Sequence, residues 1–317
     1  MITVLKPGLL TTIQDLGRIG FQRFGIIVSG AMDSYSHRIA NLLVGNEESL
    51  PTLEITLLGP HLRFEADALI SICGANLSPA IDGVPLRLWR PCMIKRGQEL
   101  TFGAVKNGCR AYIAIAGGFI VPSVMNSTST YLRGNLGGFK GRALQIGDSL
   151  AFGATSRSLH KVNWSIAYNA RPPLHHSPVI HIMKGRQFHL FSEESKHRLL
   201  TLPYEITHQS DRMGYRLNGP HLEIDNPSEM LSEAVSYGTI QVPAEGNPII
   251  LLADRQTTGG YPKIAQIASI DYSTIAQAKP GDKITFKEIS HNEAQQLYLE
   301  MERKIQYVKQ GILLNWG

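Results

Sequence analysis

The chain has 317 residues, of which 43% are hydrophobic and 18% are charged, and its formal net charge is +5. This length exceeds one ordinary domain, so we expect two domains that each bury a core of their own. No apolar run approaches the roughly 18 residues that a membrane-spanning helix needs, and the first residues lack the basic start and apolar core of a signal peptide. We therefore expect a cytoplasmic protein without a membrane partner.

Charge and cysteine content narrow the kinds of ligand. Lys and Arg form no long run with interleaved aromatic residues, so nucleic acid is a poor candidate, whereas an anionic small molecule or an acidic protein face suits the modest positive charge. Cys73, Cys92 and Cys109 cannot all pair and lack CxxC spacing, which argues against a disulfide framework and a cysteine zinc site. His175 and His176 have no ligand partners at metal-binding spacing, so we expect no metal site there.

Two short strands open the chain, at residues 3–5 and 10–13, and the second leads into a polar loop. This loop carries Asp15 and Arg18 among glycines that permit unusual backbone angles. Asp15 and Arg18 are therefore candidates to orient a ligand. An Asp–Arg pair that only closes the loop is the competing interpretation.

The first helix is predicted to begin at Asp33 or Ser34 and to end at Gly45, because residues 39–43 place apolar side chains at helical spacing. Its polar first turn directs free backbone N–H groups outward, which suits an anion. Capping by Asp33 and a solvated polar face are the alternative explanations. The site candidates of this segment are Met32, Asp33, Ser36, His37 and Arg38.

Residues 54–153 alternate short apolar runs with Gly and Pro, which is typical of a β-barrel or sandwich. The stretch 127–142 follows these strands and is rich in Ser, Thr and Gly, with three cations. It resembles an anion-binding loop but lacks the GxxxxGK[ST] pattern of a P-loop. A flexible, solvated loop is the alternative. The anion-binding candidates are Ser129, Thr130, Arg133 and Arg142.

The second half is predicted to begin with a strand at 179–183 and a short helix from Ser192 to about Leu200. Later, a strand at 239–242 turns back into the apolar strand 249–253, which ends in a dense polar cluster and two glycines. Residues without a Cβ beside a rigid strand let a ligand approach the backbone closely. A hairpin in which Asp254 pairs with Arg255 is the alternative. The candidates here are Asp211, Arg212, Asp254, Arg255, Gln256, Thr257, Gly259, Gly260, Tyr261 and Lys263.

Short internal repeats indicate that the two halves are related. The segment GPHL occurs at 59–62 and again at 219–222, and residues 97–102 resemble residues 281–286. Such repeats support two sibling β domains with the helix near 33–44 inserted in the first. The expected boundaries are a first domain at 1–155, a linker at 156–178, a second domain at 179–289, and a C-terminal helix and tail at 290–317. Within this last segment, Gly311 is expected to stop the helix after Gln310.

Five motifs together resemble a known family. They are TTIQDLGR (11–18), GAMD with SHR (30–38), DRMGYRL (211–217), GTIQVP (238–243) and DRQTTGGYP (254–262). These motifs resemble the family of the C subunit of bacterial ATP-dependent 5-oxoprolinase, which is also called the allophanate hydrolase subunit 2 or biotin-dependent carboxyltransferase family. The family includes KipA-like antagonists of the kinase inhibitor KipI.

The resemblance implies a mainly β protein with two cyclophilin-like β-barrel domains, a few short helices and a C-terminal helix. It implies one component of an ATP-hydrolysing enzyme that works with two other subunits, a KipI-like B protein and an A protein, and that opens 5-oxo-L-proline to L-glutamate only in the complex. ATP is the implied cosubstrate, with Mg²⁺ as a candidate companion ion. The chain lacks a Met-Lys biotinyl motif, so covalent biotin is not expected.

Residue roles follow from chemistry rather than from the resemblance. Phosphoryl transfer needs cations to stabilise charge, and carboxylates are suited to hold Mg²⁺ or the lactam N–H. We expect polar loops of the two domains to meet in one pocket, with Asp15, Arg18, Asp211, Arg212, Asp254 and Arg255 as its catalytic groups. Two other functions remain open: a carboxyltransferase that uses a carboxybiotin carrier, and a regulatory protein that sequesters a KipI-like inhibitor.

Overall fold

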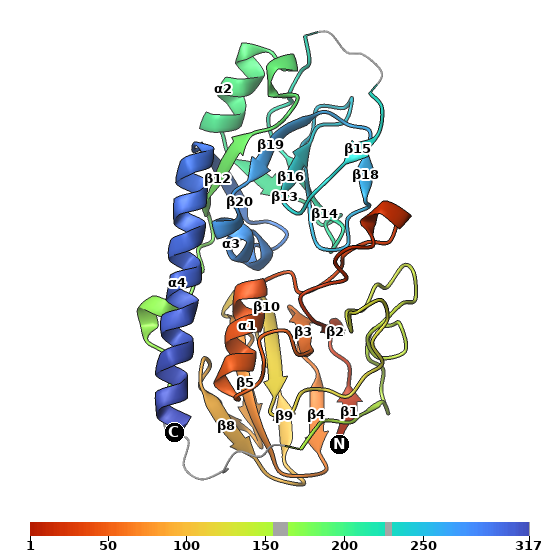
Figure 1. Ribbon diagram of the computed structural model, residues 1–317, viewed down its shortest axis with the longest axis vertical. Coiled ribbons are helices and arrows are strands. Elements are labelled where there is room, and N and C mark those ends of the chain that lie inside the picture. Colours follow the sequence, from red (N-terminus) through yellow and green to blue (C-terminus); the bar gives the residue numbers. More distant parts are fainter. Residues whose placement is uncertain (155–163, 226–229, 317) are drawn as a thin grey trace. The chain divides into compact units, whose positions relative to one another are not determined.

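The computed structural model describes residues 1–154, 164–225 and 230–316 of a mainly β protein (Figure 1). The chain forms two compact units. Unit 1 consists of Met1–Ile19, Ser29–Pro173 and Arg303–Gly317, and unit 2 consists of Gly20–Val28 and Leu174–Glu302. Both units therefore combine segments that are far apart in the sequence.

Unit 1 contains two antiparallel sheets. The six-stranded sheet has the order β11 (Ser149–Leu150), β1 (Ile2–Lys6), β4 (His61–Phe64), β9 (Glu99–Thr101), β6 (Ala80–Ile81) and β7 (Val84–Pro85). The five-stranded sheet has the order β2 (Leu10–Gln14), β3 (Thr52–Thr56), β10 (Asn107–Ile115), β5 (Ala68–Asn76) and β8 (Pro91–Ile94).

One hydrophobic core joins these two sheets. Ile2 and Leu62 enter it from the first sheet, and Ile13, Ile72 and Ile113 enter it from the second. Burying such aliphatic side chains removes their apolar surface from water, which is the main driving force for folding. Helix α1 (Ser34–Leu43) contacts β5 and β10 of the second sheet.

Unit 2 contains a closed barrel of seven strands. Their order is β12 (Val179–Lys184), β19 (Lys263–Ile267), β16 (Thr239–Gln241), β17 (Ile249–Leu251), β14 (Gly214–Asn218), β13 (Tyr204–Ile206) and β20 (Lys283–Glu288). The parallel pair β12–β20 closes the barrel, and the other neighbouring strands are antiparallel. Strands β15 (Glu233–Ala234) and β18 (Thr258–Gly259) form a separate two-stranded sheet. The prediction of a mainly β fold is confirmed.

Three further α-helices and four 3₁₀ turns complete the described residues. The helices are α2 (Glu193–Thr201), α3 (Tyr272–Gln277) and α4 (His291–Trp316), and the turns are η1 (Gln22–Phe24), η2 (Tyr168–Ala170), η3 (Phe188–Leu190) and η4 (Ser269–Asp271). The Oγ of Ser192 caps α2 by accepting a hydrogen bond from the N–H of Ser195. Of the helices that the structure describes, none is both long and apolar enough to cross a membrane.

Helix α4 extends beyond the predicted end. It begins with a reciprocal cap, in which the N–H of Ser290 donates to Glu293 and the N–H of Glu293 donates to the Ser290 hydroxyl. It then continues through Gly311 to Trp316. Ile305 and Ile312 are both buried, and their spacing keeps one face of the helix against the protein. A glycine inside a helix costs only about 1 kcal/mol relative to alanine, so this packing outweighs the stop signal.

The first part of the predicted linker (156–178), residues 156–163, lies outside the described residues. Its next part is not an open connection. Ile166 is buried, and the ring of Trp164 meets the ring of Trp316 edge to face, with their centroids 5.6 Å apart. Residues 164–173 therefore belong to unit 1, and the chain passes into unit 2 at Leu174.

Candidate functional site

In unit 1, Asp15 lies at the centre of a hydrogen-bonded cluster. Its carboxylate accepts hydrogen bonds from the hydroxyls of Ser127, Thr128 and Ser129 and from the N–H groups of Gly17 and Thr128. Burial acts to raise the pKa of this carboxyl, but the hydrogen bonds outweigh burial and lower the pKa below 3.8. The Asp15 cluster, as we name these five residues, therefore fixes the loop 127–129 against the end of β2.

Arg18 binds the same loop through backbone carbonyl groups. Its guanidinium donates to the carbonyl of Val124 at 3.0 Å and to the carbonyl of Ser129 at 2.9 Å. Gly137, with φ of 68°, lies so close that a Cβ at this position would be 2.1 Å from the Ser129 carbonyl oxygen. A glycine is therefore required where the loop 134–141 crosses Arg18.

The predicted anion-binding residues have different surroundings. Ser129 and Thr130 are buried, and their hydroxyls bond to Asp15 and to the carbonyl of Ile13. Arg142 makes a two-pronged ion pair with Asp148, with both N–O distances at 2.7 Å. Arg133 is exposed. The structure therefore places the two hydroxyls and the two cations of this prediction in separate environments.

The turn before α1 rests on a buried pair, Glu54 and Tyr112. Tyr112 donates its hydroxyl hydrogen to Glu54 at 2.7 Å, and its oxygen accepts the N–H of Asp33 at 2.7 Å. Glu54 also accepts the N–H of Met32 at 2.8 Å. Asp33 caps α1 by accepting hydrogen bonds from the N–H and hydroxyl of Ser36. Met32 and Asp33 are thus held in place from inside the protein.

His37 and Arg38 follow on the first turn of α1. His37 is fully buried with Nδ1 2.9 Å from the hydroxyl of Thr52, and burial lowers its pKa to about 4. At neutral pH this imidazole is therefore uncharged. Arg38 instead forms an ion pair with Glu48 at 2.7 Å. The alternative interpretation of a solvated polar face at His37 and Arg38 is wrong for His37, because α1 packs that side against the sheet.

In unit 2, Arg212 and Asp254 form a buried ion pair. The guanidinium binds both carboxylate oxygens, each at 2.9 Å, and both side chains are nearly inaccessible to water. Such a pair is stable only because its geometry compensates the loss of hydration. Asp254 thus pairs with Arg212, 42 residues earlier, and not with its neighbour as the alternative interpretation expected.

Arg255 and Asp211 flank this ion pair in the sequence. Arg255 is partly buried, donates to the carbonyl of Leu252 at 3.1 Å, and has its pKa lowered by burial. Asp211 is exposed, and its carboxylate accepts the N–H of Met213 at 2.7 Å. The Asp211 carboxylate therefore stabilises the turn before β14.

The remaining candidates of unit 2 follow Asp254 along the chain. Gln256, Gly260 and Tyr261 are exposed, and Thr257 is partly exposed. Gly259 is buried, and a Cβ there would be 2.6 Å from the side chain of Gln241. The absence of a side chain at Gly259 therefore permits packing against Gln241.

Lys263 is a buried cation at the end of this segment. Its ammonium group lies 2.6 Å from Glu233, whose carboxylate also contacts Arg186 at 3.1 Å and Gln187 at 3.3 Å. The hydrogen bond from Lys263 is the main cause of the lowered pKa of Glu233. Lys263, Glu233, Arg186 and Gln187 form what we call the Lys263 cluster.

Sequence reasoning missed three residues that support these sites: Glu54, Tyr112 and Glu233. A charged residue in the apolar strand TLEIT is a signal that could have identified Glu54, because a lone carboxylate is seldom buried without partners. Glu233 had no such local signal. The described residues contain no group of three or more His, Cys, Asp or Glu side chains that could hold a metal ion.

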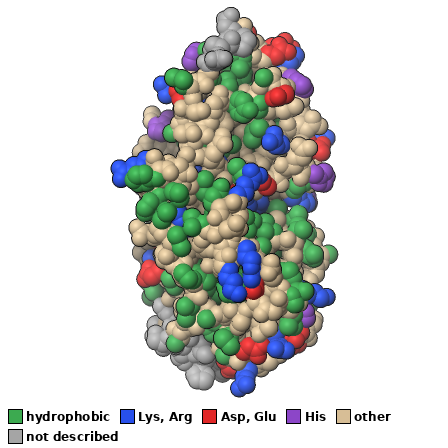
Figure 2. Space-filling model, turned by 90° about the vertical axis from the view of Figure 1, so that its right-hand side faces the viewer, with side chains coloured by type: hydrophobic (Ala, Val, Ile, Leu, Met, Phe, Trp, Pro, Cys, Tyr) green, Lys and Arg blue, Asp and Glu red, His purple; other side chains and the backbone are tan. Residues whose placement is uncertain are grey.

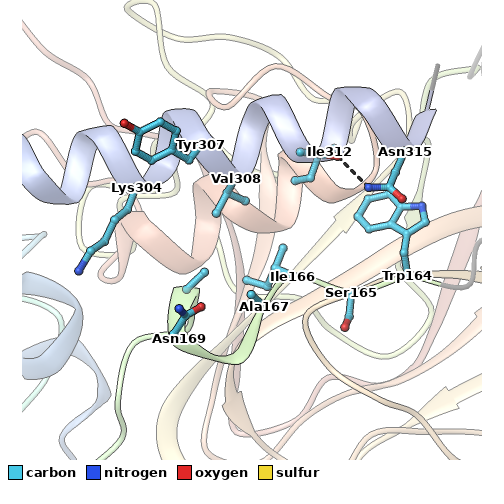
Figure 3. Close-up of a pocket in the computed structure, with 12 residues that line it drawn as sticks. Trp164, Ser165, Ile166, Ala167, Asn169, Lys304, Tyr307, Val308, Ile312 and Asn315 are labelled. Carbon is cyan, nitrogen blue, oxygen red and sulfur yellow. Dashed lines mark hydrogen bonds between the residues drawn. The ribbon is translucent and has the colours of Figure 1, made fainter.

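The surface offers a second kind of feature, an apolar groove of about 380 Å³ in unit 1. Figure 3 shows Ile166 and Ala167 on one side and Tyr307, Val308 and Ile312 of α4 on the other.

On the face that Figure 2 shows, Lys and Arg side chains are scattered in small groups among hydrophobic and uncharged ones. This face therefore carries no continuous basic stripe of the kind that binds nucleic acid.

Comparisons with known proteins extend over both units. The chain is 38% identical to the 5-oxoprolinase C subunit of Haemophilus influenzae over 96% of this chain and 98% of that protein. It is 39% identical to the 5-oxoprolinase C subunit of Escherichia coli over 96% of each chain. The crystal structure of the Kluyveromyces lactis urea carboxylase matches 98% of this chain with a TM-score of 0.90 and 33% identity, but this chain spans only 29% of that protein.

Residues 24–288 match the model of a single protein family. That range includes most of both units and all of the candidate residues of unit 2. The chain therefore belongs to the family described as carboxyltransferase domain, subdomain A and B.

Proposed function

We propose that the chain is one component of an ATP-dependent 5-oxoprolinase, which opens 5-oxo-L-proline to L-glutamate, and that it acts in a complex with the A and B proteins of that enzyme. The observation that carries this proposal is the similarity to two proteins named as the C subunit of 5-oxoprolinase, over 96% or more of both chains. The correspondence includes both units. A shared domain inside a longer protein would be a weaker argument.

The chemistry explains why such an enzyme consumes ATP. The lactam of 5-oxoproline resists hydrolysis. Transfer of a phosphoryl group from ATP to the carbonyl oxygen, with ADP leaving, would activate the carbonyl carbon for attack by water; the C–N bond would then break, and hydrolysis of the resulting acyl phosphate would release phosphate and glutamate. The protein's contribution to such a reaction is positioning and charge stabilisation. The substrate carries a carboxylate, so the accessible cations of the chain are its natural partners.

The candidate residues divide into two roles under this proposal. Asp15, Arg18, Arg212 and Asp254 have partners inside the protein, so we assign them to positioning the loops that they hold. Arg255 and Lys263 lie beside the exposed residues Gln256 and Tyr261 in sequence, so we assign them to charge stabilisation and substrate contact. Positioning residues of this kind determine whether contacting groups are held accurately.

The four candidate carboxylates of the described residues do not fit a magnesium site. Mg²⁺ needs several oxygen ligands in octahedral geometry. Asp15, Asp33, Asp211 and Asp254 instead accept hydrogen bonds or an ion pair from the protein, and no two of them share a partner in these bonds. We therefore assign no magnesium ligand to the described residues and derive no step through the ion.

Reconstitution tests the proposal directly. Purified A and B proteins of 5-oxoprolinase would be incubated with ATP and 5-oxo-L-proline, with and without this chain, and glutamate and ADP would be measured. We expect ATP-dependent glutamate only when all three are present. Glutamate formation at the same rate without the chain contradicts the proposal. Binding to the B protein without any gain in glutamate favours the regulatory function, in which the chain sequesters a KipI-like protein.

A second candidate function is carboxyl transfer. It is supported by the family description and by the TM-score of 0.90 against the Kluyveromyces lactis urea carboxylase. In that case a separate carrier must supply carboxybiotin. The test is whether this chain is needed to transfer labelled carboxylate from a carboxylated biotin carrier to urea. Such transfer would establish the carboxyltransferase function. If no transfer occurs while the complex forms glutamate, only the 5-oxoprolinase function is supported.

A further inference from the structure

Unit 2 contains a cavity of about 440 Å³ beside the barrel. Its floor is formed by three neighbouring strands, where Lys184 of β12 pairs with Ala265 of β19 and Gln266 of β19 pairs with Thr239 of β16. Its wall is formed by β15, which contains Glu233, and by the residues that follow this strand. This volume lies within the range of small-molecule sites, which is roughly 300–1,000 Å³.

The cavity lining carries excess positive charge. Among the described residues, three cationic side chains, those of Lys184, Arg186 and Lys263, line it together with a single carboxylate, that of Glu233. Lys184 pairs at 3.2 Å with Glu288, which is outside the lining. A concave surface with one sign of charge focuses the electrostatic field and attracts an ion of opposite sign.

Two donors of the cavity lining, Arg186 and Lys263, and a third beside the lining, Gln187, are already arranged around a carboxylate. Arg186 binds one oxygen of Glu233 at 3.1 Å, and Lys263 and Gln187 bind the other at 2.6 and 3.3 Å. Lys263 and Gln187 are buried and fixed by the barrel, since the N–H of Gln187 also donates to the carbonyl of Lys263. Glu233 belongs to a two-residue strand on the outside and is partly exposed.

The backbone beneath these donors is equally constrained. A Cβ at Gly185 would lie 2.2 Å from the carbonyl oxygen of Lys263, a distance that no side chain tolerates. This contact fixes the end of β12, and with it Arg186 and Gln187, against Lys263. Lys263 and Gln187 are therefore preorganised, whereas the Arg186 side chain is 76% exposed and that of Glu233 is 29% exposed.

We propose that this cavity is a binding site for a small organic carboxylate, and that the ligand's carboxylate replaces Glu233 as the partner of Lys263 and Arg186. Glu233 then acts as an internal substitute that holds the donors in position until a ligand binds. The identity of the ligand as 5-oxo-L-proline rests on the proposed function, but the site itself rests on the cavity and its charges.

Calorimetric titration of the full chain tests the proposal with three probes: 5-oxo-L-proline, its uncharged amide 5-oxo-L-prolinamide, and inorganic phosphate. We expect 5-oxo-L-proline to bind at least about tenfold more tightly than either other probe. Lys263→Met should weaken this binding at least about tenfold, whereas Glu233→Gln, which removes the internal carboxylate, should tighten it several-fold. The matched control is Lys279→Met, which removes a lysine at the same 2.6 Å from a carboxylate, Asp282, outside the cavity.

The Glu233→Gln result separates a ligand site from a purely structural cluster. If the cluster only fastens β15 to the barrel, Glu233→Gln and Lys263→Met both weaken or abolish binding, and the proposal is overturned. Should Lys263→Met fail to fold by circular dichroism, Arg186→Met replaces it, since Arg186 is 76% exposed, with an expected loss of a few-fold.

Two other results would also overturn the proposal. They are equal binding of phosphate and 5-oxo-L-proline, and no binding of 5-oxo-L-proline at about 10 mM. The free chain is used throughout, so the outcome is independent of glutamate formation by the complex. If the complex forms glutamate but this cavity binds no carboxylate, only the proposal of a carboxylate site is contradicted. If the cavity binds 5-oxo-L-proline but the complex forms no glutamate, only the proposed enzymatic function is contradicted.

Discussion

The Asp15 cluster of unit 1 and the Arg212–Asp254 pair of unit 2 bury the same kinds of side chain but compensate them differently. Asp15 is stabilised by several neutral donors from residues 17 and 127–129. Asp254 is stabilised by a guanidinium that contacts both of its oxygens. The sequences DLGR and DRMG that introduce these sites look alike, so a similar motif does not determine which partner a buried charge receives. Substitutions in the two sites should therefore lower the free energy of unfolding by different amounts.

The largest effect is expected for Asp254→Asn. The change leaves the Arg212 guanidinium buried without its counter-charge, so we expect a loss of about 3–5 kcal/mol in the free energy of unfolding. Urea denaturation followed by circular dichroism measures it. Glu193→Gln is the control, since Glu193 is 91% exposed beside Lys196, and its loss should not exceed about 1 kcal/mol. An Asp254→Asn protein that is as stable as the parent but inactive would restore Asp254 as a catalytic residue.

His37, also in unit 1, should give the next largest effect. Its pKa is about 4 in the fold because burial disfavours the charged ring, whereas an unfolded histidine titrates near 6.5. As the pH falls, the unfolded chain therefore binds the proton first. Stability is complete above about pH 6.5 and falls by roughly 3 kcal/mol as the pH drops towards 4.

The variant His37→Gln should flatten this part of the stability profile. Free energies of unfolding at several values between pH 7 and pH 4 provide the measurement. His208→Gln changes an exposed histidine of unit 2 and should leave the slope unchanged. A His37→Gln profile as steep as that of the parent would show that other groups cause the dependence.

Asp15→Asn should have an intermediate effect with its own pH window. Losing the charge weakens the hydrogen bonds to residues 127–129, so we expect a loss of about 2 kcal/mol at neutral pH. The folded pKa of Asp15 is lowered, so the stabilisation is present above the unfolded value of 3.8 and is lost as the pH falls through the folded pKa. The difference between variant and parent should therefore shrink in acid.

Unfolding of both proteins at pH 7 and pH 3 tests this prediction. The control is Asp67→Asn, because the Asp67 side chain is 46% exposed and its substitution should cost much less than that of Asp15. A difference between Asp15→Asn and the parent that does not change with pH would argue that the carboxylate charge is unimportant in the cluster.

The smallest effect is expected for Arg142→Met. Arg142 also binds both carboxylate oxygens of its partner, but it does so through Nη1 and Nη2, whereas Arg212 binds Asp254 through Nε and Nη2, and the Arg142 side chain is 27% exposed. Water replaces the lost partner, so we expect a cost of about 1 kcal/mol that decreases at high salt. Unfolding at low and high sodium chloride measures it. A cost equal to that of Asp254→Asn would contradict the idea that burial sets the strength of these pairs.

The sequence predicted the secondary-structure elements better than the contacts between side chains. The helix that begins after Asp33 and the strand at 249–251 follow from capping and apolar runs, which are local signals. The short strands β13 and β14 and helix α3 were not predicted, because their few residues show little periodicity. Gly311 was misjudged since packing at Ile305 and Ile312 decides the end of α4.

For the candidate sites, residue types were predictable but their contacts were not. Ser129 meets Asp15 across 114 residues, and Lys263 meets Glu233 across 30. No local pattern encodes such pairs, because each depends on which strands become neighbours. The Lys263 cluster shows the limit most clearly, since the short strand β15 that supplies Glu233 has no sequence feature that links it to the barrel.

All three tryptophans of the chain, Trp89, Trp164 and Trp316, belong to unit 1. Indole emission therefore reports on that unit alone, whereas the far-ultraviolet signal averages over both. Following the two signals in one melting experiment would show whether the units lose structure together or in sequence. The three tryptophans thus act as intrinsic fluorescence probes of unit 1.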